Sequence, residues 1–194
     1  MSKDQLEMHV RRFEIEGPVE ITPQRHFDDR GYFCETFNQD RLAAAGISGP
    51  VWLQDNQSFS KPANTLRGLH FQLPPFAQAK LVRVLKGSIF DVAVDIRKSS
   101  PSFGQWIAVK LTAGDFNQFY VPAGFAHGFL TLEPDVEVFY KVSASYSKQH
   151  DRSIRWDDSD LRISWPLASL VDPVLSEKDA SAPYFSSAHA TYFE

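Results

Sequence analysis

Three side chains with complementary acid–base chemistry stand in segments that alternate like β-strands: His70, Lys80 and Tyr140. An imidazole titrates near neutral pH and can act as a base, an ammonium group can stabilise a developing oxyanion, and a phenol can donate a proton. If the three converge inside one barrel, they supply a base, a cation and an acid to one site. The structural alternatives are a hydrogen-bonded core histidine, a lysine that extends to solvent and a packed tyrosine.

The segment 66–72 decides where His70 points. A regular strand over these residues places Arg67 and His70 on opposite faces, because side chains alternate along an extended chain. A bulge at Gly68 would reverse this, since one extra residue re-aims the side chains that follow. Both arrangements, and both the catalytic and the structural role of His70, stay open on the pattern alone.

His127 ends the segment 122–127, whose spacing resembles the second signature of cupin barrels, where a turn places a histidine at the barrel mouth. Metal-dependent cupins add a His-x-His pair and a carboxylate, because a divalent ion needs three or four convergent ligands. The sequence has no His-x-His pair, and Lys80 stands at the position of the carboxylate, seven residues before Gly87. A cation there would repel a metal, so the pattern predicts a barrel with no metal site.

Other polar residues carry weaker signals. Asp179 closes the segment Ser-Glu-Lys-Asp (176–179), which has the form of a capping box, so a helix start is its default interpretation. Single surface charges are usually solvated, but six residues are candidates for holding a diphosphate and a stacked base: Arg30, Arg67, Lys178, Phe27, Phe33 and Tyr146. The absence of GxGxxG, GxxxxGK[ST] and GxSxG elements argues against dinucleotide redox chemistry, P-loop phosphoryl transfer and serine hydrolysis.

Short alternating segments separated by turn residues indicate the elements that position these groups. Strands are expected over 81–85, 88–97, 106–111, 117–121, 128–132 and 136–143, the first two forming a hairpin at Gly87, and Asn38 caps a short helix that ends at Gly46. Turns about every ten residues are typical of a sandwich or barrel. We therefore predict a mainly β chain with an antiparallel jelly-roll core over about 51–146. An N-terminal β segment and C-terminal short helices and loops complete a single domain over 1–194.

Composition supports this class. The 194 residues include 16 Phe, 12 Pro and 10 Gly, a balance that favours short strands and turns over helical bundles. With a net charge of -4, the chain lacks the excess of basic residues that is typical of proteins that bind duplex nucleic acid. No apolar run is long enough to span a membrane. Because Cys34 is the only cysteine, no internal disulfide can form, and a reducing cytoplasm is the expected location.

Seven ordered segments together resemble the dTDP-4-dehydrorhamnose 3,5-epimerase family, whose members are metal-independent cupins. They are FDDRGYF (27–33), QDN (54–56), LRGLHFQ (66–72), KLVR (80–83), DVAVDIR (91–97), PAGFAHGF (122–129) and LSEKD (175–179). Two features depart from the family pattern. Cys34 stands where aromatic residues are common, and the tail beyond Pro183 has no match.

The resemblance implies a cupin-type jelly roll that forms a homodimer, with His70 as the base, Asp179 hydrogen-bonded to it and Tyr140 as the acid on the opposite face. Lys80 would stabilise the enolate oxygen, and Arg67 with His127 would help to hold the sugar nucleotide. The nucleotide and diphosphate site would be lined by Arg30, Glu35, Gln54, Asn56 and Lys178. Phe27 and Tyr146 would sandwich the thymine, either from one chain or with one ring from the partner, and Phe33 and Phe71 would add to the pocket wall.

The implied reaction inverts C3 and C5 of dTDP-4-dehydro-6-deoxy-D-glucose without a cofactor. It suits these residue types because the hydrogens on C3 and C5 are both alpha to the C4 ketone, so removing either one gives an enolate. Three alternatives stay open: a mono-epimerase that inverts only C3 or C5, a metal-dependent cupin, and a non-catalytic sugar-binding cupin. The sequence also leaves open whether dTDP or UDP is preferred.

Overall fold

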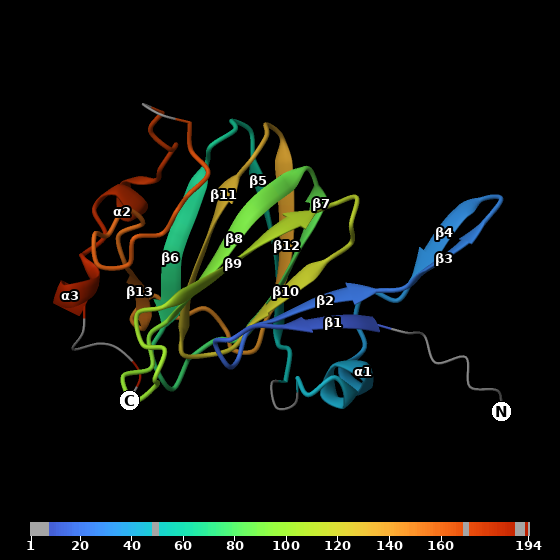
Figure 1. Ribbon diagram of the computed structural model, residues 1–194, viewed down its shortest axis with the longest axis horizontal. Coiled ribbons are helices and arrows are strands. Elements are labelled where there is room, and N and C mark those ends of the chain that lie inside the picture. The colour runs from blue at the N-terminus through green and yellow to red at the C-terminus, as the bar shows by residue number, and fades with distance from the viewer. Residues whose placement is uncertain (1–7, 48–50, 169–170, 189–192, 194) are drawn as a thin grey trace.

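The structure is a computed structural model that describes residues 8–47, 51–168, 171–188 and 193. Two antiparallel sheets and a separate two-stranded ribbon contain the named strands (Figure 1). In order across the first sheet, the strands are β1 (Met8–Arg12), β2 (Val19–Pro23), β10 (Gln118–Val121), β7 (Lys80–Lys86), β12 (Val136–Val142) and β5 (Gln54–Ser60). The second sheet consists of β13 (Asp151–Ser153), β6 (Leu66–Gln72), β11 (Phe125–Thr131), β8 (Ser88–Asp95) and β9 (Trp106–Thr112).

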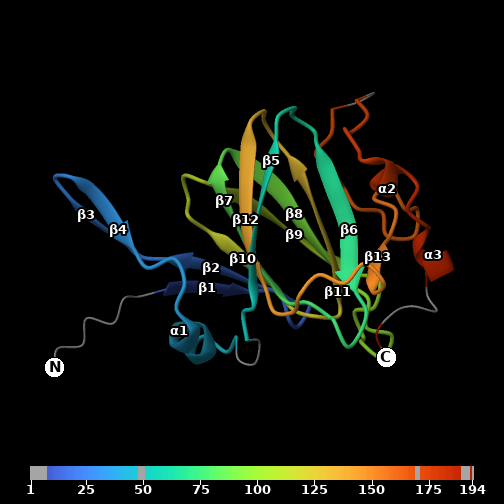
Figure 2. The ribbon, with the colours of Figure 1, turned by 180° about the vertical axis from the view of Figure 1, so that it is seen from behind.

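The remaining elements lie at the two sides of the barrel. The ribbon pairs β3 (Arg25–Asp28) with β4 (Gly31–Cys34) and projects away from the sheets. The helices are short: α1 (Gln39–Ala44), α2 (Glu177–Ala180) and α3 (Phe185–Ala188). In Figure 2, as in Figure 1, α2 and α3 lie beside β6 and β13, on the side of the barrel opposite to the ribbon.

This architecture confirms the predicted antiparallel jelly roll with a few short helices. The sheets also include strands outside the predicted core of 51–146, because β2 pairs with β10 and β13 pairs with β6. The N-terminal β segment therefore extends the first sheet. None of the helices in the described ranges is long and apolar enough to cross a bilayer.

Three apolar clusters pack against the sheets in the described part of the chain, and the first two adjoin the five-stranded sheet. The first lies between the two sheets and takes side chains from both, including Val82, Ile89, Phe119 and Val138. The second lies on the outer face of the five-stranded sheet, where the C-terminal segment covers it, and its members include Leu69, Val92, Val94, Ile154 and Phe185. Because both faces of β8 are covered, its polar side chains are buried as well as its apolar ones.

Two strand boundaries differ from the prediction by more than one residue. β11 begins at Phe125 rather than at Gly128, because Phe125 already pairs with Asp95, so His127 lies within a strand and not in the turn before it. β8 ends at Asp95 rather than at Arg97, because the Asp95 carboxylate accepts a hydrogen bond from the backbone N–H of Arg97 at 3.0 Å and the chain turns. The predicted helix is present as α1, and Asn38 caps it through its side-chain oxygen.

Gly68 makes the bulge on which the orientation of His70 depends. Arg67 lies opposite Phe129 and His70 lies opposite His127, so three steps along β6 match two steps along β11. Gly68 has a φ of +136°, and a Cβ at this position would lie 2.4 Å from the Gly128 Cα. Only glycine fits such a close approach of two backbones. The extra residue turns Arg67 and His70 toward the same cavity.

Candidate active site

A cavity of about 490 Å³ opens inside the barrel between the two sheets. Strands of both sheets and the C-terminal segment contribute to its wall, and most of the residues in this wall have polar side chains. The lining residues are Gln54, Asn56, Ser58, Arg67, His70, Phe71, Gln72, Gln78, Lys80, His127, Phe129, Tyr140, Tyr146, Asp151, Ser176, Lys178 and Asp179. Nine of the sequence-predicted polar site residues, together with Tyr146 and Phe71, are therefore brought together in one chain.

His70 and Asp179 form a hydrogen-bonded pair in the wall of this cavity. The His70 Nε2 lies 2.6 Å from Asp179 Oδ1, although the two residues are 109 positions apart. Asp179 is only 3% exposed. Burial raises the pKa of Asp179, but the hydrogen bond and charge of His70 and the hydrogen bond from Ser176 outweigh burial, and the net pKa lies below its usual value. The pair thus combines an ionised carboxylate with an imidazole that faces the cavity.

Lys80 brings a buried cation to the same cavity from β7. Its side chain is 8% exposed and its Nζ donates a hydrogen bond to the backbone carbonyl of His70 at 3.2 Å. Burial lowers the pKa of Lys80 to about 8, against the charges of Asp91 and Asp151, which raise it. Lys80 is therefore cationic at neutral pH and lies next to the backbone of the proposed base.

Tyr140 reaches the cavity from β12, which belongs to the six-stranded sheet, whereas His70 belongs to the five-stranded sheet. Burial raises the pKa of Tyr140, although the charge of Arg67 opposes this shift, so the phenol is protonated at neutral pH. The Arg67 guanidinium is held by Ser60 Oγ and by the carbonyl of Phe59, both at 3.2 Å. The imidazole of His70 and the phenol of Tyr140 thus enter one cavity from opposing sheets.

His127 forms a second imidazole–carboxylate pair that the sequence did not reveal. Its Nε2 lies 2.5 Å from Oδ1 of Asp91, and the Asp91 side chain is fully buried. Burial lowers the pKa of His127, against the charge of Asp91, so its imidazole is neutral at pH 7. Asp91 alternates along β8 with apolar residues and begins the DVAVDIR segment (91–97), and these were the signals that could have pointed to it.

The mouth of the cavity carries hydrogen-bonding groups suited to a polar ligand. Gln54 donates from Nε2 to Oδ1 of Asn56 at 2.7 Å. The Tyr146 ring is 59% exposed, and its hydroxyl donates to Asp151 Oδ2 at 3.3 Å. Lys178 also pairs with Asp151. Asp151 is a site residue that sequence reasoning missed, since nothing in its neighbourhood distinguishes it from other acidic surface residues.

The predicted nucleotide-binding residues of the N-terminal segment are not in this cavity. Phe27, Arg30 and Phe33 lie on the β3–β4 ribbon, which projects from the barrel on the side away from α2 (Figures 1 and 2). Phe27 is 69% exposed and Phe33 is 67% exposed. Arg30 pairs with Asp28 within the same ribbon. Within one chain, these residues do not join His70.

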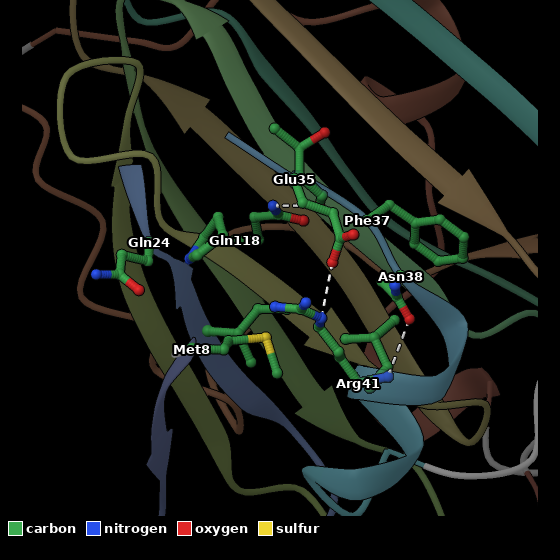
Figure 3. Close-up of a pocket in the computed structure, with 11 residues that line it drawn as sticks. Met8, Gln24, Glu35, Phe37, Asn38, Arg41 and Gln118 are labelled. Carbon is green, nitrogen blue, oxygen red and sulfur yellow. Dashed lines mark hydrogen bonds and ion pairs between the residues drawn. The ribbon is translucent and has the colours of Figure 1, made fainter. Parts of the chain in front are cut away.

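Glu35 lies in a different place, a small pocket where the ribbon meets α1 and the edge of the first sheet (Figure 3). Its carboxylate forms an ion pair with Arg41 Nε at 2.9 Å, and Gln118 donates to the carbonyl of Thr36 at 2.8 Å. These contacts anchor the base of the ribbon to the barrel. Glu35 therefore positions the ribbon in this chain and does not line the cavity.

Metal ligation has no candidate among the described residues, since no three His, Cys, Asp or Glu side chains are grouped closely enough to hold an ion. In each of the two imidazole–carboxylate pairs the histidine is hydrogen-bonded to its carboxylate, and Lys80 lies beside them. These side chains can therefore transfer protons next to a buried cation, the ammonium group of Lys80.

The fold and the cavity define a class: an enzyme that uses acid–base chemistry inside a cupin-type barrel. Within that class, the chain belongs to the dTDP-4-dehydrorhamnose 3,5-epimerase family, whose model matches residues 12–187. A dTDP-4-dehydrorhamnose 3,5-epimerase from Sinorhizobium fredii is 46% identical over 177 residues, which is 91% of this chain and 89% of the relative.

Solved structures agree with this assignment. The Legionella pneumophila dTDP-6-deoxy-D-glucose-3,5-epimerase in complex with dTDP-4-keto-L-rhamnose superposes with a TM-score of 0.87 and 40% identity, covering 93% of this chain and 94% of that one. A 3'-monoepimerase from Streptomyces bikiniensis in complex with dTDP-quinovose has a TM-score of 0.84 at 33% identity, covering 92% of this chain and 88% of that one. The fold is thus shared with enzymes that invert two centres and with one that inverts a single centre.

Proposed function

We propose that this enzyme inverts C3 and C5 of dTDP-4-dehydro-6-deoxy-D-glucose and gives dTDP-4-dehydro-L-rhamnose. The observation that carries the proposal is the single cavity in which the His70–Asp179 pair faces Tyr140 from the opposing sheet, with the buried Lys80 beside it. Inversion of a carbon requires removal of a proton from one face and return of a proton to the other. Opposed acid and base groups supply that geometry.

The first step uses His70 and Lys80. His70 removes the proton from C3 or C5, and the electron pair of the C–H bond moves toward the C4 oxygen to give an enolate. Lys80 faces this negative charge from a buried position, where a fixed cation stabilises a transition state more than it would in water. Asp179 holds the imidazole and stabilises the imidazolium that forms, which is the usual role of a carboxylate behind a catalytic histidine.

The second step uses Tyr140. Its phenol donates a proton to the same carbon from the opposite face, the enolate collapses to the ketone, and the two side chains exchange protons with solvent before the next cycle. Burial keeps the pKa of Tyr140 above its ordinary value, so the proton is available at neutral pH. Repetition at the other alpha carbon completes the double inversion. Because every step is a proton transfer, the proposal includes no cofactor and no metal.

The nucleotide part of the substrate would bind at the mouth of the cavity. Arg67 and Lys178 are cations for the diphosphate, and Gln54 and Asn56 offer amides from one strand. His127 is neutral and lies deeper, and because its Nε2 is bonded to Asp91, its other ring nitrogen can accept a hydrogen bond from a sugar hydroxyl. The exposed Tyr146 ring is suited to stack on the thymine.

The second wall of the nucleotide site would come from a partner chain in a homodimer. Phe27, Arg30 and Phe33 carry an aromatic and cationic surface on a ribbon that projects from the barrel. An exposed aromatic ribbon gains stability when a partner covers it. In the proposed two-fold dimer each ribbon would extend to the cavity of the other chain, and there Phe27 and Arg30 would face the base and the diphosphate. Cytoplasm is the proposed location, and no nucleic acid or membrane partner is proposed.

The test is incubation of the purified protein with dTDP-4-dehydro-6-deoxy-D-glucose in D₂O, with NMR detection at C3 and C5. Deuterium at both carbons is expected, and no deuterium at either would refute the proposal. Deuterium at only one carbon would identify a mono-epimerase instead. The same reaction in EDTA tests the metal-dependent alternative. The proposed mechanism predicts full activity in EDTA, whereas a metal-dependent cupin would lose activity. Parallel reactions with the UDP sugar measure the nucleotide preference.

A further inference from the structure

We propose that Ser176 is a positioning residue that orients the Asp179 carboxylate toward His70. The inference rests on the proposed function, because it concerns the same base. Ser176 Oγ donates a hydrogen bond to Asp179 Oδ2 at 2.8 Å, while Asp179 Oδ1 lies 2.6 Å from the His70 Nε2. Each carboxylate oxygen therefore has its own partner, which leaves the carboxylate plane little freedom to rotate.

The same hydroxyl also caps the helix that carries Asp179. The backbone N–H of Asp179 donates to Ser176 Oγ at 3.1 Å, so the serine oxygen accepts from the main chain and donates to the side chain of one residue. A hydroxyl can do both, because it has one donor and two acceptor positions. The capping-box pattern of 176–179 thus has a second use besides starting α2.

α2 cannot position Asp179 by itself, because it has only four residues and short helices are marginal without tertiary contacts. The chain just before Ser176 is held by backbone bonds from Val174 to Asn64 at 2.8 Å and from Leu66 to Val174 at 3.0 Å. Leu66 is the first residue of β6, the strand that carries His70. Ser176 therefore lies two residues after Val174, which is hydrogen-bonded to the strand that carries His70.

The second imidazole–carboxylate pair supplies a contrast within the same cavity. Asp91 binds His127 through Oδ1, but its Oδ2 is buried and has no hydrogen-bond partner among the residues that the structure describes. Of the two pairs, only the one formed by Asp179 has a hydroxyl group bonded to the second carboxylate oxygen among the described residues. Burial would raise the pKa of Asp179, and the bond from Ser176 is one of the interactions that keep this pKa low. Ser176 thereby supports the ionised form as well as its orientation.

Three variants separate orientation from capping. Ser176→Ala removes both functions. Ser176→Gly keeps a residue that is tolerated at a helix N-cap but removes the donor, and Ser176→Thr keeps the hydroxyl. Ser181→Ala is the matched control, since Ser181 ends the same helix and its Oγ donates to the Glu177 carbonyl at 2.7 Å without a bond to Asp179. Ser176 is exposed, so none of these changes disturbs a buried core.

The experiment measures kcat, KM and the rate of deuterium entry with the dTDP-4-keto sugar. Ser176→Ala and Ser176→Gly are each expected to lower kcat and the exchange rate about tenfold, the size of one hydrogen bond to a charged group, with KM changed less than about twofold. Ser176→Thr and Ser181→Ala are expected to stay near wild type. Wild-type values of kcat in both Ser176→Ala and Ser176→Gly would overturn the inference, and so would a loss in Ser176→Ala that Ser176→Gly does not share. An inactive wild-type protein would instead overturn the proposed function.

Discussion

His70 and His127 lie directly opposite each other on β6 and β11, and each imidazole is bonded through Nε2 to a carboxylate. Cross-strand partners project to the same face of a sheet, so the cavity wall carries two histidine–aspartate pairs side by side. The pairs differ in solvent access, because the His70 side chain is 30% exposed and that of His127 is 9% exposed. Only His70 combines contact with a carboxylate and a route for its proton to solvent.

This difference supports the proposal that His70 is the base, and the proposal can be tested by comparing two variants. His70→Asn removes the group that takes the alpha proton, so deuterium exchange and turnover should both be lost, by at least about 10³-fold. Tyr140→Phe removes only the acid on the other face, so exchange should persist in part while inversion at one centre stops. NMR at C3 and C5 in D₂O distinguishes the two. Full turnover in either variant would contradict the assigned roles.

The pH dependence should report the protonation of Lys80. Burial lowers its pKa from the ordinary 10.5 to about 8. Lys80 is charged below that pH and neutral above it, so kcat/KM should fall as pH rises through about 8. The contribution to stability has the opposite sign: the cost of burying the cation is present below about pH 8 and is lost as pH rises toward 10.5.

Lys80→Arg provides the control for this pH profile, because guanidinium stays charged well above pH 10. Its activity will be lower, since the planar group does not reproduce the ammonium position. The basic limb of its profile should nevertheless move upward by more than about one pH unit. An unchanged basic limb in Lys80→Arg would show that another group, such as Tyr140, causes the fall.

The ribbon makes a prediction about subunits. If Arg30 serves the partner's cavity, then Arg30→Ala and His70→Asn damage different sites of a mixed dimer. Co-expression of the two inactive chains yields about half mixed dimers, each with one intact site, and should restore about a quarter of wild-type activity. Mixing Lys178→Ala with His70→Asn is the control, because both residues line the cavity of the same chain. The control mixture should stay inactive, and activity of the first mixture no higher than that of the control would reject the exchanged ribbon.

The sequence could predict the strands and could single out His70, Lys80 and Tyr140, but it could not predict every residue of the cavity. Alternation along 88–97 places Asp91 on one face, but both faces of β8 are buried, so the pattern cannot show which face adjoins a cavity. The contact between His70 and Asp179 depends on a return of the chain after 109 positions, which no local signal encodes. The resemblance alone brought those two together. Phe27 and Phe33 show the same limit, since their residue type is visible but the direction of their ribbon is not.

A substitution at Asp158 tests how hydrogen bonds to one buried carboxylate hold the C-terminal segment in place. This carboxylate is 3% exposed and accepts backbone bonds from Asp160 at 2.8 Å, Leu161 at 3.2 Å and Phe185 at 2.7 Å. Asp158→Ala leaves these donors without partners and should lower the free energy of unfolding by about 3 kcal/mol. For a chain of this size that is a Tm lower by about 10 °C. Asp157→Ala, which removes a surface ion pair with Arg155, should change stability by less than about 1 kcal/mol.

Alanine at Gly68 should destabilise the fold for two reasons: the positive φ of this residue and its close contact with Gly128. Alanine at Gly31 separates them, because Gly31 has a positive φ but no close contact. The φ values are nearly equal, +136° at Gly68 and +133° at Gly31, so alanine is strained at either position. A Cβ at Gly68 would lie 2.4 Å from the Gly128 Cα, whereas a Cβ at Gly31 has nothing within 4 Å. Gly31→Ala should therefore cost about 1–2 kcal/mol from backbone conformation alone. Gly68→Ala must also push β6 away from β11, which shifts both His70 and Arg67, so it should lose activity and unfold at a much lower temperature. Thermal unfolding of both variants measures the difference, and equal losses would mean that the close approach of the two strands is not what selects glycine.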